Sequence, residues 1–207
     1  MQFDNLPTSP YLKIVLKIIR IGIKQSISKL DIAMNEGLKN QFLADTFNYL
    51  GTTNEEVWIG VSKENLTEGK QAREDIYFYL NNDNHTRIFY LEGKRLPKHN
   101  TKLKDEYIEG VNNLGNPCGG IERFKKGIHG DSKRIFDNGI IAYVENNSID
   151  FWFTKVNETI KKLYKSDEIM IKKDGYIDEY YSSHFFDYEN NSDGFRLHHF
   201  WIKLFIK

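Results

Sequence analysis

The sequence predicts one mixed α/β domain, in which a central mixed β-sheet is flanked by helices. Helical and strand-like patterns follow one another in the order helix, strands, helix, strand, helix, strand. Apolar residues make up 40% of the chain and aromatic residues 14%, which is typical of a folded protein rather than a disordered one. A chain of 207 residues can bury a large core, so we expect a single domain over residues 1–207.

An N-terminal helical segment is expected over about residues 10–50. Ser9 and Pro10 form a typical helix start, with serine as the cap and proline in the first turn. Gly22 is a candidate break in the first helix, and a second helix follows Gly37 and ends at Gly51. The first helix is predicted by apolar residues at steps of three and four: Leu12, Val15, Leu16, Ile19, Ile23, Ile27, Leu30 and Met34.

Three strands are predicted next. Residues 56–62 alternate apolar and polar side chains, which indicates the first strand. Residues 74–80 and 87–96 are rich in aromatic and branched side chains, and residues 81–84 supply Asn and Asp for a turn between them. We therefore expect the last two strands to be neighbours in the sheet.

The second half of the chain continues the alternation. Residues 107–111 and 121–130 are interpreted as short helices. Residues 139–145 are almost free of polar side chains, which is typical of a strand buried on both faces. A helix over residues 149–164 and a final strand over residues 196–206 complete the prediction.

Charge and cysteine content narrow the function classes. The 29 basic and 29 acidic residues give a formal net charge of zero, so bulk electrostatics do not favour nucleic acid, although a local basic groove remains compatible. Cys118 is the only cysteine, which rules out an intrachain disulfide and fits a cytoplasmic location. The most apolar stretch, residues 11–23, is short and interrupted by charges, so we expect no membrane partner.

Acidic and basic residues meet at the edges of the two neighbouring strands. Asp75 opens the first strand, and Glu92 and Lys94 close the second. Residues i and i+2 of a strand point to the same face, so Glu92 and Lys94 are expected to emerge together, within reach of Asp75. Two carboxylates and a lysine at one sheet edge can hold a divalent cation and activate a water. The alternative is three surface charges in weak ion pairs.

This pattern resembles the PD-(D/E)xK nuclease superfamily. Asp75 is followed, after 16 residues, by the Glu-x-Lys of residues 91–96, Leu-Glu-Gly-Lys-Arg-Leu, at the end of an apolar strand. Residues 119–127 are similar to the Gly-x-x-Arg-Phe-x-x-Gly segment that follows the motif in some members, and residues 138–144 resemble their next strand. The likeness covers roughly residues 30–165, and Glu74 stands where the motif has proline.

The resemblance implies a restriction-endonuclease-like fold and a magnesium-dependent nuclease, with Mn²⁺ as an alternative ion. It implies that Asp75 and Glu92 bind the metal together with the main-chain carbonyl of Gly93, and that Lys94 orients the attacking water or stabilises developing charge. It also implies that Glu36, on the helix before the strands, points at the metal. We expect replacement of Lys94, as a largely solvated strand-end lysine, to remove activity and leave the fold nearly intact.

The implied substrate is nucleic acid, with DNA favoured, in restriction, defence or repair. Arg95, Lys98, Lys102 and Arg123 are the predicted phosphate-binding residues, and we expect them on the same side as Asp75. A homodimer or a larger defence-system complex is compatible with this prediction. Two alternatives stay open: a catalytically silent member of the same fold that serves as a binding or assembly subunit, and an interaction domain of unrelated α/β fold. No histidine spacing predicts a metal site.

Overall fold

The computed structural model describes residue 3 and residues 6–63, 76–96, 107–112, 114–130, 135–176, 178–187 and 193–205. Among these residues, seven strands form one sheet in the order β1-β2-β3-β4-β7-β6-β5. The strands are β1 (Ile59–Ser62), β2 (Ile76–Leu80), β3 (Arg87–Leu96), β4 (Asp137–Val144), β5 (Glu168–Lys172), β6 (Glu179–Phe185) and β7 (Gly194–Lys203). The helices are α1 (Leu12–Ser26), α2 (Glu36–Thr52), α3 (Gly120–Lys125) and α4 (Ile149–Leu163). The predicted mixed α/β class is confirmed.

The centre of the sheet is parallel and its flanks are antiparallel. β4 pairs in parallel with both β3 and β7, whereas β1, β2 and β3 form an antiparallel set, as do β5, β6 and β7. All eight residues of β4 are buried, as its continuous apolar sequence predicts for a central strand. β2 and β3 are neighbours, and Ile76 pairs with Leu91. Glu92 and Lys94 therefore lie on a central strand of the sheet.

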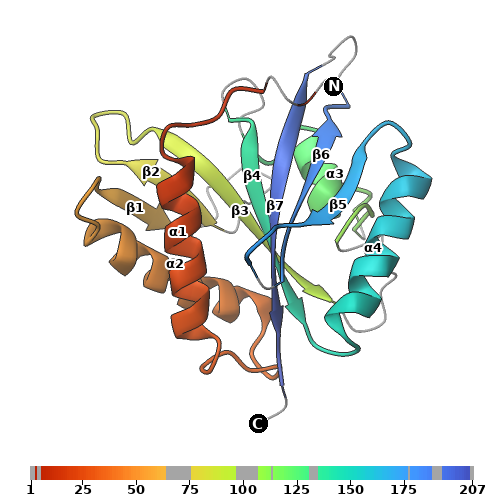
Figure 1. Ribbon diagram of the computed structural model, residues 1–207, viewed down its shortest axis with the longest axis horizontal. Coiled ribbons are helices and arrows are strands. Elements are labelled where there is room, and N and C mark those ends of the chain that lie inside the picture. Colours follow the sequence, from red (N-terminus) through yellow and green to blue (C-terminus); the bar gives the residue numbers. More distant parts are fainter. Residues whose placement is uncertain are drawn as a thin grey trace.

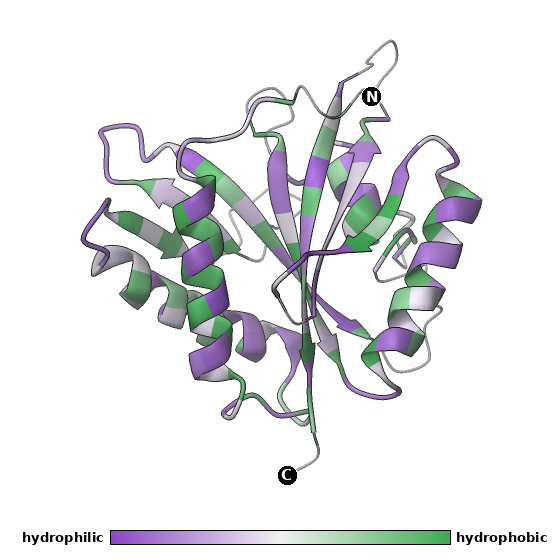
Figure 2. Cartoon of the chain, in the orientation of Figure 1, coloured by the Kyte–Doolittle hydropathy of each residue, from purple (hydrophilic) through white to green (hydrophobic). Residues whose placement is uncertain are grey.

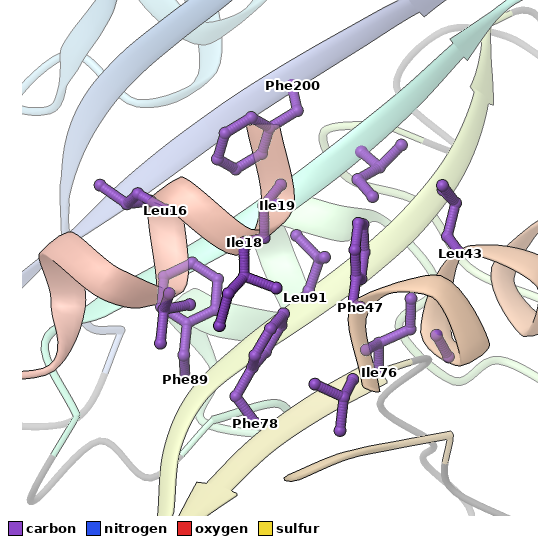
Figure 3. Close-up of a cluster of buried hydrophobic side chains, with 14 of the residues drawn as sticks. Leu16, Ile18, Ile19, Leu43, Phe47, Ile76, Phe78, Phe89, Leu91 and Phe200 are labelled. Atoms are coloured by element: carbon purple, nitrogen blue, oxygen red, sulfur yellow. The ribbon is translucent and has the colours of Figure 1, made fainter. Parts of the chain in front are cut away.

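Helices cover both faces of the sheet (Figure 1). α1 and α2 pack on one face over a core that includes Phe47, Phe78 and Phe89 (Figure 3). α3 and α4 pack on the other face over a second core, to which Phe124 and Trp201 belong. Hydrophobic and hydrophilic residues alternate along α1 and α4 (Figure 2), and their buried residues, such as Ile19 and Val156, belong to the cores on the two faces of the sheet. Within the described part of the chain, no helix is long and apolar enough to cross a membrane.

The N-terminal helices differ in detail from the prediction. Gly22 does not break α1: a Cβ at this position would lie 2.4 Å from the Phe47 ring, so glycine allows α1 and α2 to approach closely. α1 ends at Ser26 rather than near Met34. α2 begins at Glu36, before Gly37, because the Asn35 side chain accepts a hydrogen bond from Leu38 N at 2.8 Å and caps the helix.

The expected helix over residues 107–111 is absent from the described structure. Tyr107 and Ile108 lie in a buried turn, and Val111 forms an isolated bridge with Pro117. The helix expected over residues 121–130 is shorter, because α3 ends at Lys125 and Gly127 takes a left-handed conformation with φ 62°. Tyr107 and Ile108, before α3, and His129, after it, are all buried.

Candidate functional site

Side chains alternate along β3, so consecutive residues of this strand point to opposite faces of the sheet. Leu91 belongs to the core under α1 and α2, and a Cβ at Gly93 would lie 2.2 Å from Asn40 Oδ1 of α2. Tyr90 and Leu96 belong to the opposite core, under α3 and α4. Glu92 and Lys94 share the face of Tyr90 and Leu96. The predicted common orientation of Glu92 and Lys94 is therefore observed, on the α3 side of the sheet.

Three basic side chains surround the Glu92 carboxylate. Lys94 Nζ lies 2.6 Å from Oε1, and Arg123 Nη1 lies 3.1 Å from the same oxygen. His129 Nδ1 lies 2.8 Å from Oε2, although the orientation of the two groups does not meet hydrogen-bond geometry. Glu92 is only 1% exposed. The lysine and arginine thus converge on one carboxylate oxygen and the histidine stands beside the other.

The electrostatics of Glu92 follow from these contacts. Burial by itself raises the pKa of a carboxyl, because it disfavours the charged form. The positive charges of Lys94 and Arg123, and that of His129 whenever this side chain is protonated, outweigh burial and hold the pKa of Glu92 far below its ordinary value. Glu92 is therefore an ionised, acceptor-only group at neutral pH.

Local structure around α3 explains how Arg123 and His129 reach Glu92. A Cβ at Gly120 would lie 3.1 Å from Tyr107 O and 3.5 Å from Lys94 Cγ, so the first residue of α3 sits closely over the sheet. After Gly127 the chain folds back, and Ile128 N and His129 N both donate to Arg123 O, at 2.9 and 3.2 Å. The Gly-x-x-Arg-Phe-x-x-Gly segment thus supplies Arg123, and the turn that follows Gly127 brings His129 beside the same carboxylate.

Unpartnered polar atoms gather at this site. Among the described residues, six buried side-chain nitrogen or oxygen atoms have no hydrogen-bond partner. Five of them belong to Glu92 (Oε2), Arg123 (Nε), His129 (both ring nitrogens) and Asn138 (Oδ1). Asn138 adjoins the same loop, since a Cβ at Gly130 would lie 3.5 Å from its Oδ1. We call Glu92, Lys94, Arg123, His129 and Asn138 the Glu92 cluster.

Buried polar atoms usually find partners, so the concentration of exceptions singles out these residues as a candidate site for an ion or a water. Mg²⁺ prefers oxygen ligands and keeps several waters, so Glu92 Oε2 fits as one donor for such an ion. Within the described residues, no group of three or more His, Cys, Asp or Glu side chains is arranged to hold a metal. The second predicted carboxylate, Asp75, lies outside the described residues, as do Lys98 and Lys102.

Two other predicted site residues, Arg95 and Glu36, have contacts outside the Glu92 cluster. The Arg95 guanidinium binds Glu145 through two hydrogen bonds of 2.7 and 2.6 Å, and Lys39 Nζ lies 2.9 Å from the same carboxylate. Glu36 Oε2 accepts a 3.2 Å hydrogen bond from the main-chain nitrogen of Arg95. Because Arg95 follows Lys94 by one residue, its side chain projects to the α2 face, opposite Arg123. The structure therefore does not bring these two predicted phosphate-binding arginines together.

Lys94 is also less solvated than the sequence suggested. It is 8% exposed, and its amine is held by the buried Glu92. Removing one partner of a buried ion pair costs about 3–5 kcal/mol, because the other charge is left uncompensated. The expectation that Lys94 is largely solvated is therefore wrong, and we now expect its replacement by alanine to destabilise the fold. Its amine must be replaced by a side chain of similar length that still hydrogen-bonds.

Sequence reasoning missed His129 and Asn138. Neither residue lies near Glu92 in the sequence, and an isolated histidine after a glycine-bounded helix carries no recognisable spacing. Gly127 was the available signal, since a glycine directly after a short helix predicts a reversal of the chain.

No family model matches this chain, and neither the curated proteins nor the solved structures give a significant match.

Proposed function

We propose that the protein is a magnesium- or manganese-dependent nuclease of the restriction-endonuclease-like class, which hydrolyses phosphodiester bonds of DNA. The observation that carries the proposal is the contact between Glu92 and Lys94. Both side chains are buried on one face of a central strand, and Lys94 Nζ lies 2.6 Å from the carboxylate. A carboxylate and an amine fixed together in this way are the groups that metal-assisted phosphodiester hydrolysis needs.

Each residue has a distinct role in this proposal. Glu92 offers Oε2 as a hard oxygen ligand, and the proposal adds the Gly93 carbonyl and Asp75 as further ligands. A bound divalent ion would supply an acidified water and a Lewis acid for the phosphate. Lys94 holds a compact positive charge where negative charge develops on the phosphate oxygens. Arg123 fixes the carboxylate from α3 and, through its unpartnered Nε, has a donor left for a phosphate oxygen.

A second candidate is a nuclease-fold subunit without catalytic activity, which serves in binding or assembly. One observation favours it: Oε1 of Glu92 already receives two cations, and the carboxylate is 1% exposed. An ion that binds Glu92 must compete with Lys94 and Arg123 for its charge.

Cleavage assays on three variants separate the two candidates. Glu92→Gln and Lys94→Gln keep the size and hydrogen-bonding capacity of the side chains and remove their charges. Lys155→Gln is the control, because Lys155 lies on α4, is half exposed and pairs with Glu158. Plasmid and linear single-stranded DNA serve as substrates, with Mg²⁺ or Mn²⁺. We expect Lys94→Gln to slow cleavage by about 10²–10³-fold and Glu92→Gln by at least as much, since each removes a preorganised charge.

The outcomes discriminate clearly when all proteins are compared below their thermal midpoints. Cleavage in the wild type and Lys155→Gln, with loss in the other two, supports the nuclease. Equal cleavage in all four proteins points to a contaminant or another site. Absence of cleavage in all four, with both ions and both substrates, favours the silent subunit.

A further inference from the structure

A second polar arrangement lies on the same side of the sheet as the Glu92 cluster and involves β6 and β7. Its five hydrogen bonds measure 2.7–2.9 Å, and its side chains are almost completely buried. The members, in order, are Trp201, Tyr107, His199, Ser182, His184 and Asp167. We call them the hydrogen-bond chain.

The two ends of this chain fix the direction of every bond. The Trp201 indole N–H only donates, so Tyr107 Oη accepts from it and donates its own proton to His199 Nδ1. His199 must then donate from Nε2 to Ser182 Oγ, and Ser182 must donate to His184 Nε2. His184 donates from Nδ1 to Asp167 Oδ2, which only accepts. Both imidazoles are therefore neutral, with His199 protonated on Nε2 and His184 on Nδ1.

Tyr107, the second member of the chain, and Asp167, at its other end, also hold α3. The main-chain oxygen of Tyr107 accepts a 3.1 Å hydrogen bond from Ile121 N in the first turn of α3. Asp167 Oδ2 lies 2.9 Å from Lys125 Nζ, at the last residue of the helix. Arg123, which binds Glu92, lies between these two attachments. The position of Arg123 therefore depends on a helix that the hydrogen-bond chain anchors at each end.

Asp167, His184 and Ser182 follow the acid, base and nucleophile order of serine hydrolases. Ser182 is 1% exposed, however, and its oxygen lies between two imidazole nitrogens at 2.7 Å each. A substrate carbonyl has no path to that oxygen, so the arrangement does not act as a hydrolase site.

We propose that the hydrogen-bond chain is an acid-sensitive clamp on α3, which positions Arg123 against Glu92 only while His184 and His199 are neutral. Protonation of His184 places a second N–H on Ser182 Oγ, which already accepts from His199. The Ser182 hydroxyl proton then has no acceptor within the chain. Protonation of His199 has the same effect on the Tyr107 hydroxyl. A buried hydroxyl proton without an acceptor destabilises the arrangement that holds it.

The surrounding charges decide which imidazole is protonated first. Asp167 touches His184 and favours its charged form, and Asp187 acts in the same direction, whereas Lys125 opposes it. Burial disfavours a positive charge on both imidazoles, and His184 and His198 add to this effect at His199. Acid therefore opens the clamp first at His184, next to Asp167, which binds Lys125.

Histidine side-chain ¹⁵N spectra and amide hydrogen exchange test the clamp. At about pH 7.5 we expect the Nδ1–H form of His184 and the Nε2–H form of His199. As His184 titrates, the Ile121 and Glu122 amides of α3 should exchange about tenfold faster or more, after correction for intrinsic rates, because the clamp has lost a buried hydrogen bond. Ser182→Ala should remove this response and leave both amides poorly protected at every pH.

Ser183→Ala is the matched control. Ser183 is the next residue of β6, is 2% exposed and points to the other face of the sheet, so its variant should behave as the wild type does. If Ser182→Ala does not fold, Tyr107→Phe breaks the same chain and keeps the ring. The Nε2–H form of His184 at neutral pH, or an unchanged pH response in the chain-breaking variant, would overturn the clamp. The clamp is independent of what the Glu92 cluster catalyses.

Discussion

The Glu92 cluster and the hydrogen-bond chain lie on the same side of one sheet and share α3, yet they differ in how their polar atoms are satisfied. Every link of the chain is a hydrogen bond of 2.7–2.9 Å. In the Glu92 cluster, charges converge on Oε1 while Oε2, Arg123 Nε and both nitrogens of His129 have no hydrogen-bond partner among the described residues. A fully satisfied network stabilises a fold, whereas unsatisfied buried atoms raise its energy and mark a place where a ligand can act.

The largest expected effect on stability is at Asp167, which belongs to the fully satisfied hydrogen-bond chain. We expect Asp167→Asn to lower the free energy of unfolding by about 3 kcal/mol, because the carboxylate is buried and accepts from His184 and Lys125. Burial raises the pKa of Asp167, but His184 and Lys125 outweigh it and hold this pKa below the ordinary value. The substituted amide keeps the shape and loses the charge. Urea unfolding at neutral pH measures the change.

Glu158→Gln is the control for this substitution. Its carboxylate is 59% exposed and pairs with the exposed Lys155, so its loss should change stability by less than about 0.5 kcal/mol. Similar small effects in both variants would contradict a stabilising role for the hydrogen-bond chain.

Acidification is expected to have the next largest effect on stability. Burial lowers the pKa of His184 despite the raising effect of Asp167, and burial lowers that of His199 well below the ordinary value of 6.5. As the pH falls through that value, the unfolded chain binds protons that the folded chain does not. Stability is therefore present above this pH and is lost below it, by up to about 1.4 kcal/mol per pH unit for each histidine.

This loss has its own pH window. The pKa of Glu92 is lower in the folded chain than its ordinary value of 4.5, so protonation of this carboxyl reduces stability only below about pH 4.5. Between about pH 6.5 and 4.5, the loss of stability therefore comes from the histidines and not from Glu92. Urea midpoints across this window should fall by an amount equal to about 2 kcal/mol for His199. In His199→Gln, whose amide can still donate to Ser182, most of that slope should disappear. An unchanged slope would mean that other groups titrate in this range.

Local patterns predicted most of the elements but not their long-range contacts, and the helix expected over residues 107–111 is absent from the described structure. β3 has the bounds that its aromatic and branched residues predict, and β4 is buried along its whole length, as expected. The shared face of Glu92 and Lys94 follows from strand alternation alone. The same alternation, applied one residue further, would have placed Arg95 on the other face. The grouping of Arg95 with Arg123 relied on sequence proximity and ignored this periodicity.

The hydrogen-bond chain could not be predicted from the sequence. Two of its links connect distant parts of the sequence. Tyr107 and His199 are separated by 92 positions, and Tyr107 and Trp201 by 94 positions. His198 and His199 are consecutive residues of β7, so strand alternation places them on opposite faces: His198 lies 3.1 Å from Asp137, whereas His199 binds Ser182. Which partner each histidine finds depends on the strand order β4-β7-β6, which is a property of the whole sheet.

The smallest expected effect on stability is at His129, and it distinguishes the two readings of the Glu92 cluster. His129 is 2% exposed, yet neither ring nitrogen has hydrogen-bond geometry with a described partner, and Lys94 and Arg123 remain on Glu92 when it is replaced. We therefore expect His129→Gln to lower the free energy of unfolding by about 1 kcal/mol or less, since the loss of a contact without a hydrogen bond costs little more than its packing.

Residues that serve a ligand are often retained at little benefit to stability, or at a cost to it. A small loss in His129→Gln, measured by urea unfolding beside Asp167→Asn, would place the Glu92 cluster in that class and favour the nuclease. A loss as large as that of Asp167→Asn would show that His129 stabilises Glu92 as a structural group. The cluster would then resemble the hydrogen-bond chain, and the silent subunit would become the better account of this protein.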